Sequence, residues 1–379
     1  ESENDEEQKD ADRQENTDQQ ESADRQAQPQ QAAPAAAAAS APGFCDHIIT
    51  VINKAATALK LTLKDVKIDV SDTGNYSADG KAALSVQGEG NVEIELDGDN
   101  VLKSGYDRAG LEKNTSKGTL TLKDDKEAGS GSLKAEGGDC GAGIGGGSGK
   151  NITITGGSVT AFGGDCGAGI GGGDGGAAEN ITITGGTVTA AGGYYGAGIG
   201  GGSGGSGSGG SGKNITITGG SVTAAGGWGG AGIGGGGWIS GNGGWVSGQN
   251  ITITGGTVNA DGGDCGAGIG GGKENSGSNV TVSGAAQVTA TAGKSNGYYG
   301  AGATIGSGGN ETGGQPVDGD EIRADIRGVT TGYIHHIIYN DDGTIKREWW
   351  EPERPQPKPE SPQPNPEDPN APAEESNEV

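Results

Sequence analysis

The sequence has few of the bulky side chains from which a thick protein core is usually built. It contains no methionine and two phenylalanines in 379 residues, and aromatic residues make up only 4% of the chain. It also lacks a run of about 18 apolar residues, the length that a helix needs to span a bilayer. We therefore expect neither a large globular core nor membrane insertion. Because an initiating methionine and a hydrophobic leader are also missing, we interpret the sequence as that of a processed, mature chain.

Basic residues are scarce as well. Lysine and arginine number 25 against 50 acidic residues, which gives a net charge of −25. Such a protein repels the phosphate backbone that nucleic-acid-binding proteins neutralise with basic side chains. Nucleic acid is therefore excluded as a partner. Much of the negative charge lies in the two ends of the chain rather than in its middle.

The chain has too few candidate catalytic groups for an enzyme to be predicted. Its three histidines fall near the two ends of the repetitive region, far from any repeating carboxylate: His47, His335 and His336. Glycoside hydrolases act through paired carboxylates. The repeats offer one column of them, Asp139, Asp165 and Asp264, and aromatic residues interrupt it. We predict no catalytic residue and interpret the histidines as structural.

The sequence also predicts no cofactor and no metal site. Stacked calcium sites in repeat proteins need a recurring Gly-Gly-x-Gly-x-Asp phrase, and the run from Gly171 to Asp174 has no successors. Calcium is the one cofactor that we keep as an alternative. A zinc site is not expected, because the chain lacks the CxxC spacing of such sites.

Glycine, by contrast, is abundant, with 84 residues, and it occurs in two phrases that repeat together. The phrase Asn-Ile-Thr-Ile-Thr-Gly-Gly begins at Asn151, Asn180, Asn214 and Asn250, with a weaker copy at Asn279. The phrase Gly-Ala-Gly-Ile-Gly-Gly-Gly begins at Gly141, Gly167, Gly196, Gly230 and Gly266, with a weaker copy at Gly300. Glycine does not recur at every third residue, which excludes collagen. A fixed order of short segments with unequal spacers is typical of a solenoid.

Each repeat contains three short β-prone segments joined by glycine corners. In the first, Ile152 and Ile154 alternate with polar residues, as in a half-buried strand. The second places Val159 inward. In the third, which we expect over Gly141–Gly145, alanine and isoleucine alternate with exposed glycines. Since glycine is about 1 kcal/mol worse than alanine inside a helix, helices are not expected. The chain is predicted to be an all-β, single-stranded, right-handed parallel β-helix.

The repeat pattern also divides the chain. Less regular coils at 61–90, 91–118 and 119–150 precede five glycine-rich ones, which gives about eight coils. We expect the following parts: a disordered acidic, Gln- and Ala-rich segment at 1–43; an N-terminal cap and degenerate coils at 44–150; glycine-rich coils at 151–313; a β-hairpin cap at 314–350; and an acidic linker with nine prolines at 351–379. Turn residues Asp341-Asp342-Gly343 indicate the hairpin, and the run His47–Ile52 is suited to the first cap.

Four cysteines allow three disulfide pairings: Cys45, Cys140, Cys166 and Cys265. Cys140 and Cys166 occupy the same position of consecutive coils, so their Cα atoms should lie about 5 Å apart, within disulfide range. We predict that these two are bonded; stacked free thiols are the alternative. Cys45 and Cys265 would have to join opposite ends of the stack, so that pairing is not expected.

The aromatic residues suggest a ligand-binding strip. They gather at the corner before the third segment and in the long insertion after it: Tyr194, Tyr195, Trp228, Trp238, Trp245, Tyr298 and Tyr299. A glycine strip edged by aromatic rings would give a sugar chain a flat surface with rings on both margins. Alternatively, glycine only permits tight corners and the aromatic residues cover loop backbone.

Three segments resemble a known group of proteins: Leu61–Val70, Glu95–Gly105 and Ala109–Asn114, followed by the glycine phrases. Together they are similar to extracellular proteins of Gram-positive, mostly clostridial, gut bacteria that are labelled carbohydrate-binding-domain or cell-surface proteins. The resemblance covers roughly residues 60–310. It implies a parallel β-helix like that of polysaccharide lyases and an extracellular, secreted or cell-surface location.

We therefore predict a non-catalytic module that binds carbohydrate or mediates adhesion, with a glycan or surface polysaccharide as partner and cell-wall attachment through a tail. A polysaccharide-active lyase or hydrolase is the first alternative, and a structural stalk is the second. A minor alternative is an ice-binding protein, because the first segments should present two outward ranks of hydroxyl side chains: Thr153, Thr155, Thr182, Thr184, Thr216, Thr218, Thr252, Thr254, Thr281 and Ser283. Threonine also simply suits an exposed β surface.

Overall fold

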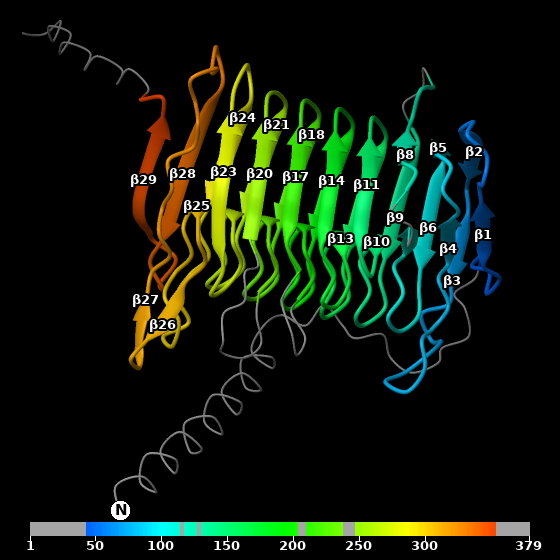
Figure 1. Cartoon of the computed structure of the whole chain (residues 1–379), viewed down its shortest axis with the longest axis horizontal. Coiled ribbons are helices and arrows are strands. Elements are labelled where there is room, and N and C mark those ends of the chain that lie inside the picture. The colour runs from blue at the N-terminus through cyan, green and yellow to red at the C-terminus, as the bar shows by residue number, and fades with distance from the viewer. Residues whose placement is uncertain (1–42, 114–116, 127–129, 204–209, 238–246, 354–379) are drawn as a thin grey trace, which may run out of the picture.

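The chain forms a right-handed parallel β-solenoid, built from three long sheets that run along one axis (Figure 1). The computed structural model describes residues 43–113, 117–126, 130–203, 210–237 and 247–353. The tails predicted at 1–43 and 351–379 lie almost wholly outside these residues. In Figure 1 the coils follow one another in sequence order from one end of the stack to the other.

Sheet 1 has nine strands in the described residues: β1 (Ile49–Ile52), β4 (Leu84–Gln87), β7 (Leu111–Lys113), β10 (Ile144–Gly146), β13 (Ile170–Gly172), β16 (Ile199–Gly200), β19 (Ile233–Gly234), β22 (Ile269–Gly270) and β25 (Ile305–Gly306). Sheet 2 has eight there: β2 (Leu59–Lys64), β5 (Val92–Asp97), β8 (Leu120–Lys123), β11 (Gly149–Ile154), β14 (Ala178–Ile183), β17 (Gly212–Ile217), β20 (Ser247–Ile253) and β23 (Ser276–Val282).

Sheet 3 has ten strands in the same residues: β3 (Lys67–Asp69), β6 (Asp99–Lys103), β9 (Ser132–Glu136), β12 (Ser158–Phe162), β15 (Thr187–Ala191), β18 (Ser221–Ala225), β21 (Thr257–Asp261), β24 (Gln287–Thr291), β28 (Tyr333–Tyr339) and β29 (Ile345–Glu351). Each pass of the chain visits sheet 2, then sheet 3, then sheet 1. The eight strands of sheet 2 mark eight passes, between which lie about seven full turns. The predicted fold class is confirmed.

The core consists of columns of like residues. Ile152 and Ile154 are fully buried, and Ile152 pairs in register with Leu120 on one side and Ile181 on the other. In sheet 3, Val159 is buried between Leu133 and Val188. Because side chains alternate between the two faces of a strand, every second residue points into the narrow interior of the solenoid. Branched aliphatic side chains fill this interior without large aromatic rings. The inward positions predicted for the first two segments of the repeat are confirmed.

The third segment differs from the prediction. Its strand β10 starts at Ile144, later than the expected start at Gly141, and residues 141–146 are all buried. A Cβ atom on Gly145, whose φ is +136°, would lie 2.0 Å from the carbonyl oxygen of Gly171 in the next pass. Glycine is required here because neighbouring passes approach too closely for any side chain. The glycines of sheet 1 therefore form a buried contact between passes, which corrects the expectation of an exposed glycine strip.

A ladder of asparagines runs along the corner before the Ile-Thr-Ile segments. Each ladder residue has a left-handed φ between 54° and 59°. From the second member onward, each side-chain amide also donates to the amide oxygen of the asparagine in the preceding pass, at 2.9 to 3.1 Å. Its members are Asn151, Asn180, Asn214, Asn250 and Asn279. Asparagine tolerates this backbone conformation better than other side chains, so one residue type both turns the corner and bonds the passes together.

Further strands pair at both ends of the stack. At the first end, β1 pairs with β4, so the strand expected within His47–Ile52 is confirmed over Ile49–Ile52. At the other end, β28 and β29 form the expected antiparallel hairpin, and β28 adds to sheet 3 beside β24. A small hairpin of β26 (Asn310–Thr312) and β27 (Gln315–Val317) was not predicted.

Candidate functional site

Two of the aromatic residues expected on the ligand-binding strip are buried. Tyr195 and Trp228 are 1% and 2% exposed and pack edge to face, with Tyr194 stacked on Trp228 at a centroid distance of 5.2 Å. The buried ammonium of Lys273 lies 4.7 Å from the Trp228 centroid and 3.7 Å from that of Tyr299. These cation–π contacts stabilise a charge that burial would otherwise disfavour.

This aromatic cluster covers a corner between passes instead of offering its faces to a ligand, which corrects the expected platform at Tyr195 and Trp228. Tyr194 and Tyr299 are half-buried, whereas Tyr298 is 44% exposed. Trp238 and Trp245 lie outside the described residues, so their part in ligand binding stays a prediction.

The column of cysteines is formed as expected. The Cys140 and Cys166 thiols are free and lie in hydrogen-bond contact with each other. This contact raises the pKa of Cys140 and lowers the pKa of Cys166. Since the two sulfur atoms already meet, their oxidation to a disulfide stays a prediction. Cys45 is exposed, and Cys265 is buried at the other end of the stack.

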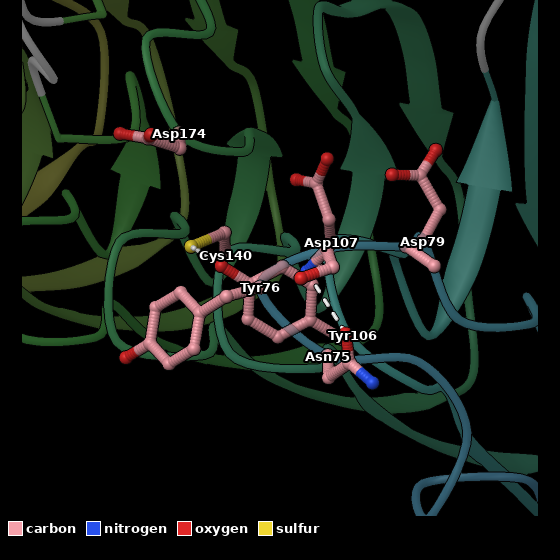
Figure 2. A pocket seen from close by; sticks show the side chains of 9 residues that line it. Asn75, Tyr76, Asp79, Tyr106, Asp107, Cys140 and Asp174 are labelled. Atoms are coloured by element: carbon pink, nitrogen blue, oxygen red, sulfur yellow. Dashed lines mark hydrogen bonds between the residues drawn. The ribbon is translucent and has the colours of Figure 1, made fainter.

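A pocket of about 300 Å³ opens beside this column (Figure 2). Four loops build it. The loop between β3 and β4 supplies residues 75–79, the next pass supplies Tyr106 and Asp107, and later passes supply Cys140 and Asp174. The first loop is fixed by main-chain bonds, because Tyr106 N donates to Thr73 O at 2.9 Å and Gly80 N donates to Tyr106 O at 2.8 Å.

The pocket presents an aromatic face. The Tyr76 ring is 90% exposed and packs at a tilt of 57° against the half-buried ring of Tyr106, with their centroids 5.2 Å apart. The Tyr106 hydroxyl accepts a weak hydrogen bond from the Cys140 thiol at 3.8 Å. Tyr106 therefore anchors the aromatic pair, while the outer ring stays open to solvent.

Three carboxylates line the same pocket: Asp79, Asp107 and Asp174. In Figure 2 the side chains of Asp79 and Asp107 extend side by side in one direction. Partial burial, and then the negative charges of Asp79 and Asp174, raise the pKa of Asp107. The positive charge of the neighbouring Arg108 offsets this only in part, because its guanidinium is held by the buried carboxylate of Glu112. The pocket is thus acidic, with an aromatic surface at its rim.

Sequence reasoning missed this pocket. Tyr76 stands alone in an irregular coil, and the loops that surround it are separated by dozens of residues in sequence. The available signal was a single aromatic residue in a polar turn, Asn75-Tyr76-Ser77, within a region of otherwise strand-like pattern. Asp174 was weighed only as a calcium ligand.

The histidines differ in their surroundings. His335 stacks on Trp350, and its Nε2 lies 2.6 Å from the Glu348 carboxylate. His336 is buried and stacks on Trp349; burial lowers its pKa to about 4. Neither is among the residues that line the pocket, and their interpretation as structural residues stays a prediction.

The third histidine lies in a group that the sequence did not predict. The side chains of Cys45, Asp46 and His47 gather three potential metal ligands within 4.8 Å of one another. This is the only such trio among the residues that the structure describes. The three pocket carboxylates do not all lie as close to one another as the atoms of this trio do. They are therefore better placed to bind separate hydroxyl groups than one metal ion.

The outward hydroxyl ranks of sheet 2 are partly in place. Thr153, Thr182, Thr216, Thr252 and Thr281 pair in register and are half-exposed. The residues of the second rank come directly after the strands of sheet 2. Thr184, for example, follows the last residue of β14, and its N–H donates to Ile154 O at 2.8 Å. Regular spacing of this kind follows from the solenoid itself, so ice binding stays an untested alternative.

Comparison with known proteins agrees with the fold. The Beta helix repeat family model matches four segments, 152–174, 181–203, 215–237 and 251–273. Each segment begins in sheet 2, crosses sheet 3 and ends just after a strand of sheet 1. Neither the curated proteins nor the solved structures include a match to the chain. Within the described ranges, no helix is long and apolar enough to cross a membrane.

Proposed function

We propose that this β-helix repeat chain is a non-catalytic carbohydrate-binding module of the cell surface or extracellular space, and that its sugar lies in the acidic pocket at Tyr76. The observation that carries the proposal is the exposed Tyr76 ring beside three carboxylates. The C–H face of a pyranose packs on an aromatic ring, while carboxylates accept strong hydrogen bonds from sugar hydroxyls. Attachment to a cell wall through one of the tails belongs to the same proposal.

The size and charge of the pocket narrow the ligand. A volume of about 300 Å³ is at the lower end for ligand sites, so the pocket accommodates a short part of a glycan. The three carboxylates that line the pocket repel the carboxylates of uronic and sialic acids. We therefore expect preference for neutral or amino sugars over anionic ones.

The proposal is tested by measuring glycan binding with the full chain and two tyrosine variants. Tyr76→Ala should weaken binding by more than about 1 kcal/mol, because aromatic anchors dominate such contacts. Tyr298→Ala is the matched control, since it removes another exposed ring at a distant part of the stack. An unchanged affinity in Tyr76→Ala, with the far-ultraviolet circular dichroism spectrum retained, would refute the pocket assignment. Loss in Tyr298→Ala alone would favour the aromatic strip instead.

One observation favours an enzyme as the second candidate. The raised pKa of Asp107 beside two other carboxylates is the arrangement from which a general acid is made. In this case the protein would release reducing ends from a neutral polysaccharide, and Asp107→Asn would abolish the release. We expect no release by the wild-type chain or by the variant, because the three carboxylates lie on separate loops.

A further inference from the structure

The first end of sheet 3 carries a tripeptide that the carbohydrate proposal does not use. Cys45 is tied to β3 by two main-chain bonds: its N–H donates to Lys67 O at 2.9 Å, and its carbonyl accepts from Asp69 N at 3.0 Å. Cys45 thus continues sheet 3 by one residue and is fixed to a rigid scaffold. The His47 side chain then turns back to the cysteine sulfur, and the Asp46 carboxylate contacts the same imidazole.

Three different donor atoms converge at this point. The distance from Cys45 Sγ to His47 Nδ1 is 3.4 Å, and that from Asp46 Oδ1 to His47 Nδ1 is 2.9 Å. The main-chain N–H of His47 also donates to Cys45 Sγ at 3.2 Å, which holds the sulfur beside the imidazole. The His47 and Asp46 side chains are 88% and 83% exposed, so an ion can reach them from solvent.

The spacing of the donors fits a metal ion. Zinc–sulfur bonds of about 2.3 Å and zinc–nitrogen bonds of about 2.05 Å at a tetrahedral angle place the two ligand atoms roughly 3.5 Å apart, close to the observed 3.4 Å. Oxygen and nitrogen ligands at about 2.1 Å from an ion, at a right angle to each other, are roughly 2.9 Å apart, which is the distance between Asp46 Oδ1 and His47 Nδ1. All three donor atoms lie within 4.8 Å of one another, close enough to share one ion.

We propose that Cys45, Asp46 and His47 bind one divalent transition-metal ion of borderline softness, such as Zn²⁺, Co²⁺ or Ni²⁺. Thiolate and imidazole ligands select such ions over Ca²⁺ and Mg²⁺, which prefer oxygen. The thiolate and the carboxylate together balance the charge of the ion, and water completes its coordination. All the other cysteines and histidines of the chain lie within the described residues, and none of them joins such a trio.

Cobalt(II) is the probe for this site. The full-length, reduced, metal-free chain is titrated with cobalt(II) chloride, and a near-ultraviolet thiolate-to-cobalt charge-transfer band should appear and saturate at one ion per chain. Binding should be lost as the pH falls, because thiol and imidazole must both be deprotonated to ligate. Zinc(II) should displace the cobalt and remove the band.

The variants separate this site from the other thiols. Cys45→Ser should abolish the band, His47→Gln should weaken cobalt binding at least about tenfold, and Cys140→Ser, the matched control, should leave the titration unchanged. All three are compared by circular dichroism to confirm the fold. A wild-type chain without a charge-transfer band, or a band that survives Cys45→Ser, overturns the proposal.

Discussion

Replacement of Asn214, in the middle of the asparagine ladder, tests how the passes are held together. Its amide donates to Asn180 Oδ1 at 3.1 Å and its oxygen accepts from Asn250 Nδ2 at 3.0 Å. Two exposed hydrogen bonds contribute about 1–2 kcal/mol. Alanine at the same φ of 54° adds about 1 kcal/mol of backbone strain. Asn214→Ala should therefore lower the free energy of unfolding by about 2–3 kcal/mol.

A glycine at the same position separates the two contributions. Asn214→Gly loses both hydrogen bonds but accepts the left-handed backbone, so its cost should be about 1 kcal/mol smaller than that of alanine. Asn259→Ala is the matched control, because Asn259 is an exposed residue of β21 outside the ladder. Its effect should stay within about 0.5 kcal/mol.

The three variants are compared by urea denaturation followed by circular dichroism, using the shift of the midpoint at a common m-value. If Asn214→Ala is no more destabilising than Asn259→Ala, the ladder does not stabilise the stack. If glycine costs as much as alanine, the backbone conformation of the corner contributes nothing and the account of the left-handed φ is refuted.

Two further predictions concern titration and oxidation. His336 has a pKa of about 4, against an ordinary value near 6.5, so below pH 6.5 the unfolded chain takes up a proton that the folded chain does not. The free energy of unfolding should therefore fall between pH 6.5 and pH 4, by up to about 3 kcal/mol. His336→Gln should make the free energy of unfolding, measured from denaturation curves, less dependent on pH in this range. The same pH dependence in the variant would contradict the prediction. Cys140 and Cys166 should form a disulfide on mild oxidation. The intact mass after alkylation should then show that two of the four thiols no longer react. Four reactive thiols after oxidation would refute the pairing.

Local alternation carries most of the fold. Ile152 and Val159 could be placed inward because the two-residue period of a strand and the repeat of the phrase are both visible in the sequence. The terminal hairpin could be found from its Asp-Asp-Gly turn in the same way. These features depend on residues that are neighbours in the chain.

Features that depend on contacts between passes could not be found in this way. Asn151 fits an outward strand position, and nothing local shows that its backbone is left-handed. Trp228 has the appearance of an exposed loop residue until Lys273, from the next pass, is seen to pack against it. The pocket at Tyr76 joins loops from different passes, including Asp174. The glycine strip was misplaced for the same reason, since its burial results from the approach of successive passes.

The corner between sheet 1 and sheet 2 absorbs all the variation in repeat length among the four repeats that begin at Asn151, Asn180, Asn214 and Asn250. β13 ends at Gly172 and β14 begins at Ala178, whereas β16 ends at Gly200 and β17 begins only at Gly212. The strands on both sides nevertheless keep the same register. The other two corners of these repeats have constant length.

An insertion within a strand would turn every following side chain to the opposite face, but one at this corner leaves the stack unaltered. Duplicated repeats can therefore diverge at this edge independently of one another, each acquiring a loop of its own length and chemistry while the scaffold is inherited unchanged. The same corner is where a foreign peptide could be grafted into the chain, one copy per repeat, to display an evenly spaced array.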